Sequence, residues 1–358
     1  MGYDFKVTRT TAPKEKPDQS ALGFGKYYTD HMFLMDYDEG QGWHDGRIVP
    51  YGPLSIDPAA CTLHYAQMTF EGMKAYKNPE GGINLFRPDM NAKRLQNSND
   101  RLCIPRIDED LYIEAVKAIV DVDRDWVPDA QGTSLYIRPF IISPEPSMAV
   151  HPASKYWFII ILSPVAAYYE GNDKELHGSR IWVEEEFIRA AVGGTGFAKC
   201  GGNYAAANRA GENAEKKGFT QVLWLDGVER KYIEEVGAMN VMFKINGEII
   251  TPALTGSILP GITRKSCIEV LRKEGYTVTE RLLSIDELTA AMENGTLEEA
   301  WGCGTAAVVS PIGELFYDEK KYTVNNMEIG EVTQKLYNIL TGIQWGKVED
   351  TFGWTVEI

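Results

Sequence analysis

Two short runs of strand-forming residues, separated only by a tight turn, most limit what this chain can fold into. Val241–Ile245 and Glu248–Thr251 flank the dipeptide Asn246-Gly247. Asn-Gly supplies the positive backbone φ angles that a two-residue hairpin turn requires, so the two runs are predicted to pair antiparallel. A parallel pair would need a crossover of a dozen or more residues. The sequence therefore favours sheets built from antiparallel hairpins.

The other periodic runs do not alternate strand and helix as a doubly wound βαβ fold does. The predicted strands include Ser134–Ile142 and Tyr156–Leu162, and the predicted helices begin at Pro88, Thr263 and the capping box Ser284–Glu287. Cys61–Tyr76 is rich in strand formers and is predicted as extended chain, interrupted at Phe70-Glu71-Gly72. We therefore expect an α+β fold with mostly antiparallel sheets and flanking helices.

A chain of 358 residues is long for one hydrophobic core, so two domains are expected. The periodic pattern breaks over residues 163–179, which contain Pro164, Gly171 and Gly178. This break predicts a small N-terminal α+β domain over residues 1–165, an interdomain connector over 166–179, and a large C-terminal domain over 180–358.

Charge and cysteine usage exclude several classes of protein. The net charge is −15, which should repel nucleic acids and anionic membranes. The five cysteines have no metal-ligand spacing, and their odd number favours free thiols in a reducing cytosol. The first 20 residues are polar, unlike a secretory signal, and no apolar run is long enough to span a membrane. We expect a cytoplasmic protein with no metal, nucleic-acid or membrane partner.

The stretch Gly194–Tyr204 places one lysine in an apolar, glycine-rich turn before a predicted helix. Desolvation lowers the pKa of an ammonium group, and a neutral amine can attack a carbonyl to form a Schiff base. Lys199 is therefore a candidate nucleophile, with Tyr204 five residues further on. A solvated turn lysine without a catalytic role is the alternative that this stretch alone leaves open.

Further along the chain, polar residues occur where they could serve such a lysine. Glu234 and Glu235 are adjacent on a predicted strand, so at most one of them can face a given site. A buried carboxylate there could keep a pyridine nitrogen protonated. Ser257–Thr263 leads into a helix whose first N–H groups, with a capping threonine, could bind phosphate. Without a ligand, the acids would be solvated residues at a strand end, and the helix would be an ordinary capped helix.

Three other features could bind anions. Arg94 lies on a predicted helix and could clamp a phosphate, although a solvated arginine is equally consistent with its position. Cys303–Ala307 offers small residues, open amides and a hydroxyl. Tyr136 and Arg138 lie two apart on one strand and therefore project to the same face. His31 lies between apolar residues and is interpreted as a hydrogen-bonded structural histidine.

The order of these features resembles the branched-chain amino acid aminotransferases, which are fold-type IV enzymes that use pyridoxal 5'-phosphate. The matching sequence motifs are FGKYYTDHM, FEGMKAY, NAKRL, LYIRPF, GGTGFAKCGGNYAA, YIEEVGAMN, LPGITR and CGTAAVV. They extend from about Phe24 to the C-terminus. The long N-terminal arm and the EVGAMN form resemble the subgroup that includes the animal enzymes.

The resemblance implies roles for individual residues. Lys199 matches the lysine that binds the cofactor and moves the proton, Glu235 matches the acid at the pyridine nitrogen, and Tyr204 matches the tyrosine near the phenolic oxygen. The phosphate set is matched by Arg94, Ile262, Thr263 and Thr305, with Arg189 as a further cofactor contact. The substrate set is matched by Tyr136, Thr305 and Ala306 for the α-carboxylate, Arg138 for a distal carboxylate, and Phe24, Tyr65, Phe70 and Tyr168 for the branched side chain.

The resemblance also implies a reaction: L-leucine, L-isoleucine or L-valine reacts with 2-oxoglutarate to give a branched-chain 2-oxo acid and L-glutamate, catalysed by a homodimer. Some animal members carry a Cys-x-x-Cys pair after the GTA word, where this chain has Ala307 and Ser310, so no such thiol switch is expected. A D-amino acid aminotransferase, an aminodeoxychorismate lyase and a catalytically silent binding protein remain alternatives.

Overall fold

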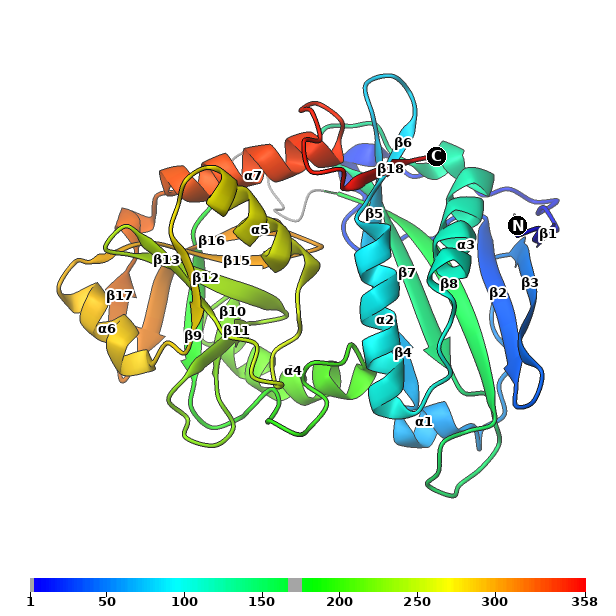
Figure 1. Cartoon of the computed structure of the whole chain (residues 1–358), viewed down its shortest axis with the longest axis horizontal. Coiled ribbons are helices and arrows are strands. Elements are labelled where there is room, and N and C mark those ends of the chain that lie inside the picture. The colour runs from blue at the N-terminus through cyan, green and yellow to red at the C-terminus, as the bar shows by residue number, and fades with distance from the viewer. Residues whose placement is uncertain (1–2, 167–175) are drawn as a thin grey trace. The chain divides into compact units, whose positions relative to one another are not determined.

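The computed structural model describes residues 3–166 and 176–358, and the chain divides into two compact units (Figure 1). Unit 1 comprises Met1–Glu170, Ala198–Gly201 and Gly342–Ile358, and unit 2 comprises Gly171–Phe197 and Gly202–Thr341. The chain therefore passes from unit 1 to unit 2, returns for four residues, and returns once more at its end.

Unit 1 is built on a nine-stranded sheet with the strand order β1-β3-β2-β8-β7-β5-β6-β18, in which β4 also pairs with β7. The strands are β1 (Lys6–Val7), β2 (His31–Asp38), β3 (Gly42–Pro50), β4 (Met68–Phe70), β5 (Met73–Lys77), β6 (Ile83–Phe86), β7 (Ser134–Ile142), β8 (Lys155–Val165) and β18 (Thr355–Glu357). Among the described pairs of this sheet only β1–β3 is parallel.

Two helices, α2 (Pro88–Leu102) and α3 (Glu109–Val122), lie over one face of this sheet (Figure 1). Pro88 occupies the first helical position of α2, and the Asp108 side chain caps α3 by accepting from the amides of Asp110 and Leu111. The core beneath the helices contains Met73, Ala75, Leu135 and Ile137 of β5 and β7, with Ala92, Leu95, Val116 and Ile119 of the helices. Since strand residues alternate, Lys74, Tyr136 and Arg138 project from the opposite face.

The sheet of unit 2 closes on itself. Its order is β11-β10-β9-β16-β15-β12, β11 also pairs with β12, β13 and β14 continue from β12, and β17 pairs with β16. The strands are β9 (Ser179–Glu184), β10 (Gln221–Leu225), β11 (Ile233–Val236), β12 (Met239–Ile245), β13 (Glu248–Pro252), β14 (Val278–Arg281), β15 (Leu297–Gly304), β16 (Val308–Tyr317) and β17 (Lys320–Thr323). The hydrophobic core that these strands share includes Val183, Leu223, Val241, Phe243 and Leu315.

The helices of unit 2 surround this sheet. They are α4 (Gly201–Lys216), α5 (Ile262–Lys273), α6 (Ile285–Glu293) and α7 (Glu331–Gln344), and α7 ends within unit 1. The predicted capping box is present, because the Ser284 hydroxyl accepts from the amide of Glu287. Ala210 and Ala214 of α4 pack with Val222 and Trp224 of β10.

The expected α+β class with mostly antiparallel pairing is confirmed. The predicted hairpin is β12–β13, with Ile245 opposite Glu248 and positive φ at both Asn246 and Gly247. The prediction of extended chain from Cys61 is wrong for its first part, because Cys61–Tyr65 forms the helix α1. The buried Cys61 at the start of this turn fixes it against Ser147, a long-range contact that local strand propensity does not reveal.

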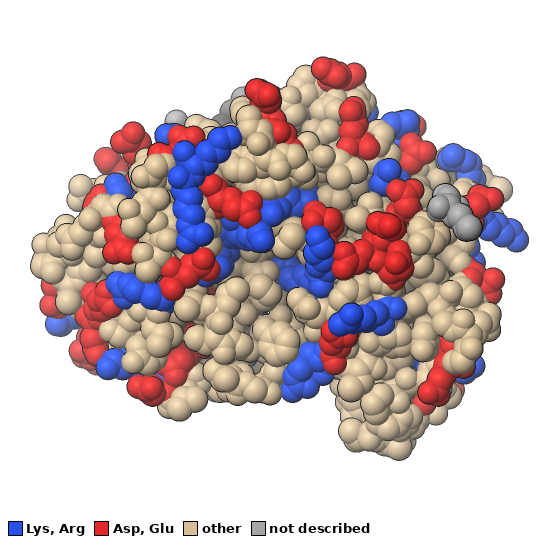
Figure 2. All heavy atoms as spheres, viewed as in Figure 1, with Lys and Arg blue, Asp and Glu red and all other residues tan. Residues whose placement is uncertain are grey.

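His31 has the structural environment that its apolar neighbours indicated. Its Nδ1 lies 2.6 Å from an Asp123 carboxylate oxygen, and its Nε2 accepts from the amide of Thr10. The Nε2 contact therefore attaches the N-terminal arm to β2, and the Nδ1 contact joins β2 to the end of α3. The surface carries acidic and basic side chains interspersed on the face drawn in Figure 2.

Candidate active site

Lys199 belongs to the short segment that returns to unit 1, directly before α4. Its amide donates to the Ser98 hydroxyl of α2 at 2.8 Å, and its carbonyl accepts from the amide of Phe70 at 3.0 Å. The next residue, Cys200, forms an isolated β-bridge with Thr69. The backbone on both sides of the lysine is therefore fixed to unit 1.

The Lys199 side chain lies over an aromatic ring and has a perturbed pKa. Its Nζ is 4.8 Å from the centre of the Phe70 ring. Burial lowers the pKa of Lys199 to about 8, with the positive charge of Arg94 acting in the same direction and the carboxylate of Glu71 opposing the shift. With a pKa of about 8, roughly a tenth of the amine is neutral at pH 7, far more than for a solvent-exposed lysine.

Arg94, predicted to bind phosphate, is engaged by a carboxylate within unit 1. Its Nε lies 2.8 Å from Glu71 Oε1 and its Nη2 lies 2.7 Å from Glu71 Oε2. Asn91 Nδ2 donates to the same Glu71 oxygen at 2.7 Å. Glu71 is fully buried, and this bidentate pair fixes the orientation of the guanidinium.

Sequence reasoning missed both Glu71 and Ser98. Glu71 lies within the FEGMKAY motif, which is one of the motifs that carry the resemblance. It is the acidic residue of that motif, so it could have been considered as a partner for Arg94. Ser98 lies four residues after Arg94 on the same helix, and its hydroxyl also donates to the Arg94 carbonyl. Its contact with Lys199 joins residues 101 positions apart and leaves no local signal.

Tyr136 and Arg138 lie together on one face of β7, as their spacing predicts. Arg138 Nη2 donates to the Tyr136 hydroxyl at 3.0 Å, and the Arg138 guanidinium lies 4.8 Å from the centre of the Phe70 ring. The Phe24 ring meets Tyr136 edge-on at 5.0 Å. A side chain at Gly72 would come within 2.2 Å of the Tyr136 oxygen, so glycine is needed beneath this hydroxyl.

Two residues predicted for the substrate pocket are not part of this group of contacts. Tyr65 ends helix α1, is 37% exposed, and donates its hydroxyl to the Met148 carbonyl. The contacts described for it do not reach Tyr136 or Phe70. Tyr168, together with most of the predicted connector, lies outside the described residues.

In unit 2, Glu235 is held by two donors. Arg189 Nε lies 2.9 Å from Glu235 Oε2, and the amide of Leu259 donates to Glu235 Oε1 at 2.8 Å. The neighbouring Glu234 projects to the other side of β11 and accepts from the Ser257 hydroxyl. Both carboxyl groups are buried, so neither is the solvated strand-end acid that the sequence left open.

Ile262 and Thr263 are the first two residues of α5. The expectation that a threonine caps this helix is wrong, because the N-cap is Gly261, which provides no side-chain cap. A helix start without a side-chain cap has backbone N–H groups suited to an anion. Thr305 and Ala306 lie in the turn between β15 and β16, and Tyr204 lies in the first turn of α4.

The predicted residues therefore form two groups, each within its own unit. Unit 1 brings together Lys199, Arg94, Phe70, Tyr136, Arg138 and Phe24, and unit 2 holds Tyr204, Arg189, Glu235, Ile262, Thr263, Thr305 and Ala306. The groups they offer are the buried Lys199 amine, the buried Glu235 carboxylate and a start of α5 that has no side-chain cap. This donor set fits a phosphorylated pyridine aldehyde.

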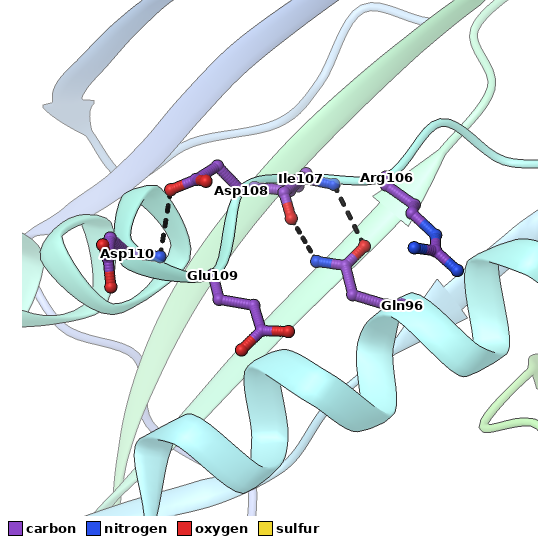
Figure 3. A pocket seen from close by; sticks show the side chains of 6 residues that line it. All are labelled: Gln96, Arg106, Ile107, Asp108, Glu109 and Asp110. Atoms are coloured by element: carbon purple, nitrogen blue, oxygen red, sulfur yellow. Dashed lines mark hydrogen bonds between the residues drawn. The ribbon is translucent and has the colours of Figure 1, made fainter.

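A surface hollow of about 440 Å³ in unit 1 has different chemistry (Figure 3). It is lined by Gln96, Arg106 and Ile107 and by the acids Asp108, Glu109 and Asp110. The Gln96 side chain bonds both backbone groups of Ile107, which is a structural role.

Within residues 3–166 and 176–358, no cluster of metal-ligating side chains occurs and no helix is long and apolar enough to cross a membrane.

Residues 68–315 match the model of the family described as amino-transferase class IV. "Branched-chain-amino-acid aminotransferase 2" of Bacillus subtilis is 55% identical over 353 residues, which cover 99% of this chain and 96% of the relative. A "Branched-chain-amino-acid aminotransferase" of Mycolicibacterium smegmatis is 43% identical over 364 residues, with 99% and 98% coverage.

Solved structures of lower identity share the fold. The branched-chain amino acid aminotransferase of Escherichia coli superposes with a TM-score of 0.75 at 27% identity and covers 91% of this chain and 98% of its own. The branched-chain aminotransferase of Thermoproteus uzoniensis with norvaline gives 0.72 at 25% identity, with 91% and 99% coverage. The family model spans more than half of the chain and the relatives span nearly all of it, so the chain belongs to the class IV aminotransferases and, within them, to the branched-chain amino acid aminotransferases.

Proposed function

We propose that this enzyme transfers the amino group of L-leucine, L-isoleucine or L-valine to 2-oxoglutarate, with pyridoxal 5'-phosphate as cofactor. The observation that carries the proposal is the Lys199 amine, whose backbone is held on both sides and whose pKa is about 8. Such an amine is available near neutral pH as a nucleophile and as a base. The names of relatives that are 53–55% identical support the substrate class.

The cofactor assignment rests on the donor set and on the relatives. Solved branched-chain aminotransferases that share the fold are described as complexes with N-(5'-phosphopyridoxyl)-L-glutamate and with pyridoxamine 5'-phosphate. We assign the phosphate to Arg94, Ile262, Thr263 and Thr305, the ring nitrogen to Glu235, and the phenolic oxygen to Tyr204. When bound, the cofactor supplies an electron sink that stabilises negative charge at the substrate Cα.

The proposal gives Lys199 the proton transfers, in addition to its attachment to the cofactor. The neutral Lys199 Nζ would accept the proton from the Cα of the amino acid, and its ammonium form would return one to the cofactor within the same half-reaction. With the 2-oxo acid, Nζ would move a proton in the opposite direction. The Phe70 ring beneath Nζ stabilises the ammonium while it holds that proton. Arg189 pairs with Glu235 and keeps its carboxylate oriented.

Substrate selection requires one pocket for two kinds of side chain. We assign the α-carboxylate to the Tyr136 hydroxyl and to Thr305 and Ala306. The distal carboxylate of 2-oxoglutarate and glutamate is assigned to Arg138, which already donates to Tyr136. The branched side chains are assigned to the aromatic residues Phe24, Phe70, Tyr65 and Tyr168, of which Tyr65 lies partly exposed in unit 1.

We further propose a homodimer in the cytoplasm. In unit 1, α1 and the loop after β7 expose Leu63, Tyr65, Met148 and Val150, with Met148 70% and Val150 82% exposed. The Tyr65 hydroxyl bonds the Met148 carbonyl, so α1 and this loop lie next to each other and both expose apolar side chains. A patch of this kind suits burial against a second copy of the chain. The free cysteines suit a reducing compartment.

The test is an absorption spectrum of the purified protein before and after addition of L-leucine and, separately, of D-alanine. We expect a visible band from the bound cofactor that L-leucine removes and D-alanine leaves unchanged. Removal by D-alanine alone would place the chain with the D-amino acid aminotransferases in function. Absence of a band after addition of pyridoxal 5'-phosphate would overturn the cofactor assignment and favour a silent binding protein.

A further inference from the structure

The segment Ser257–Gly261 in unit 2 belongs to no helix or strand, and its first three residues are buried. Ser257 is fully buried, and Ile258 and Leu259 are 3% and 8% exposed. Backbone groups in such a segment need hydrogen-bond partners, because buried and unpaired they cost free energy. Here side chains from other parts of unit 2 supply several of these partners.

Glu235 and Asn240 bind one residue of this segment from its two sides. The amide of Leu259 donates to Glu235 Oε1 at 2.8 Å, and Asn240 Nδ2 donates to the Leu259 carbonyl at 3.0 Å. Glu235 and Asn240 are direct partners across the β11–β12 pair. Side chains of directly paired residues leave a sheet on the same face, so the two can reach a single peptide residue.

Asn240 also contacts the residue that begins α5. A Cβ atom on Gly261 would lie 1.9 Å from Asn240 Oδ1, so this oxygen lies directly against the Gly261 Cα. Gly261 is the N-cap of α5 and has an ordinary φ of −68°, so glycine is required here for space and not for conformation. The Asn240 amide therefore spans from Leu259 to the helix start.

The other end of the segment is held separately. Arg189 Nη1 donates to the Ser257 carbonyl at 3.0 Å, while Arg189 Nε pairs with Glu235. Glu234 accepts from the Ser257 hydroxyl. A Cβ on Gly196 would lie 2.1 Å from the Ser257 carbonyl oxygen, which shows how closely the Gly196 backbone approaches this point.

We propose that Asn240 is a positioning residue that fixes the start of α5 relative to the Glu235 carboxylate. This inference rests on the proposed function, in which Glu235 serves the ring nitrogen and α5 serves the phosphate of one rigid cofactor. The two groups must keep a constant separation, and Asn240 bonds the residue that Glu235 bonds while contacting the residue that starts the helix. An aspartate would instead present a second carboxylate to the Leu259 carbonyl and to Glu235.

The test compares cofactor affinity with and without the phosphate group. For Asn240→Ala we expect the dissociation constant of pyridoxal 5'-phosphate to rise about tenfold, as loss of one hydrogen bond allows. The dissociation constant of pyridoxal, which lacks the phosphate, should change by less than about twofold, because Arg189 still holds Glu235. Hydrogen exchange at the Leu259 amide of the cofactor-free protein should become faster.

A matched control separates positioning from a general loss of stability. The Asn294 side chain accepts from the amide of Thr296 at 3.0 Å at the end of α6. Asn294→Ala should lower the melting temperature and leave both dissociation constants unchanged. If Asn240→Ala weakens both ligands equally, or lowers stability without changing either affinity, Asn240 is only structural and the inference is wrong.

A second variant keeps the inference testable if Asn240→Ala does not fold. Gly261→Ala introduces a methyl group against Asn240 Oδ1 and should also weaken the phosphorylated ligand selectively. If Asn240→Ala does fold, Gly261→Ala should cost less in that background, because the clash is removed; additive effects would contradict the contact. Failure of the wild-type protein to bind pyridoxal 5'-phosphate would overturn the proposed function itself, and is thereby distinguished from failure of this inference.

Discussion

Arg94 donates two parallel hydrogen bonds to Glu71, from Nε to Oε1 at 2.8 Å and from Nη2 to Oε2 at 2.7 Å, and both side chains are buried. Glu71 directly precedes Gly72, where the Tyr136 hydroxyl leaves no room for a side chain, and Arg94 lies one helical turn before Ser98. The pair therefore connects β4–β5 to the helix that holds the Lys199 backbone.

Glu71→Gln should destabilise the protein strongly, because it leaves the buried Arg94 charge without its carboxylate. We expect the free energy of unfolding to fall by about 3–5 kcal/mol, measured by urea denaturation. Asp100→Asn is the matched control: it breaks an ion pair with Arg106 whose side chains are 44% and 68% exposed and should cost less than about 1 kcal/mol. Equal costs for the two variants would contradict a structural role for the buried pair.

Lys199→Ala should abolish covalent attachment of the cofactor. After addition of pyridoxal 5'-phosphate and reduction with borohydride, peptide mapping of the wild-type protein should find the tag at Lys199. The variant should carry no tag and should lose transamination by on the order of 10³-fold or more.

Lys74→Met provides the control for this experiment. Lys74 is also buried and its pKa is also lowered to about 8, but by burial alone, and it lies on β5. We expect that a lowered pKa alone does not make a lysine bind the cofactor, and that the position of Lys199 is also needed. The Lys74→Met protein should therefore still be tagged at Lys199. A tag at Lys74 in the wild-type protein would show that the nucleophile is misassigned.

Arg138→Met should separate the two substrate classes. Removal of the guanidinium should raise KM for 2-oxoglutarate about tenfold to a hundredfold, as expected for loss of hydrogen bonds to a charged group. KM for 4-methyl-2-oxopentanoate should change by less than about threefold. Tyr136→Phe, which removes the hydroxyl that Arg138 contacts, should instead raise KM for both. Parallel changes in the Arg138 variant would exclude it from distal-carboxylate recognition.

Glu234 should make stability depend on pH. Burial raises the pKa of Glu234 from 4.5 to about 7, the negative charge of Glu235 adds to this, and the Ser257 hydrogen bond and Arg189 oppose it. A raised carboxyl pKa means that the folded state binds the proton more tightly than the unfolded state does. Protonated Glu234 therefore contributes its whole stabilisation below pH 4.5, and this contribution is lost as the pH rises to about 7.

The free energy of unfolding of Glu234→Gln, relative to that of the wild-type protein, should therefore increase by up to about 3 kcal/mol as the pH rises from 4.5 to 7. It should then stay nearly constant up to pH 8. Urea denaturation at pH 4.5, 6, 7 and 8 measures this difference. A difference that is constant with pH, or that shrinks as pH rises, would show that Glu234 does not titrate in this range.

Local sequence signals predicted the parts of the fold that local physics determines. The Asn246-Gly247 hairpin, the helix start at Pro88 and the Ser284–Glu287 capping box all depend on residues within a few positions of each other. The common face of Tyr136 and Arg138 follows from strand periodicity. These features needed no knowledge of tertiary contacts.

Other features depend on contacts across long stretches of sequence. The Ser98–Lys199 and Glu71–Arg94 bonds and the contacts of Asn240 appear only after folding. At Cys61–Tyr65, tertiary packing outweighs strand propensity and a helix forms. At α5, proximity to the helix start favoured Thr263 as the cap, but the backbone places Gly261 there.

The last strand of the chain has a consequence for how the protein is made. β18, Thr355–Glu357, pairs with β6, Ile83–Phe86, and the Trp354 carbonyl accepts from the amide of Arg87. On the ribosome, β6 therefore stays without this partner strand while the second unit is synthesised. The sheet of the first unit is completed only after the second unit has been made, and a nascent chain released before β18 would leave β6 as an open edge exposed to other chains.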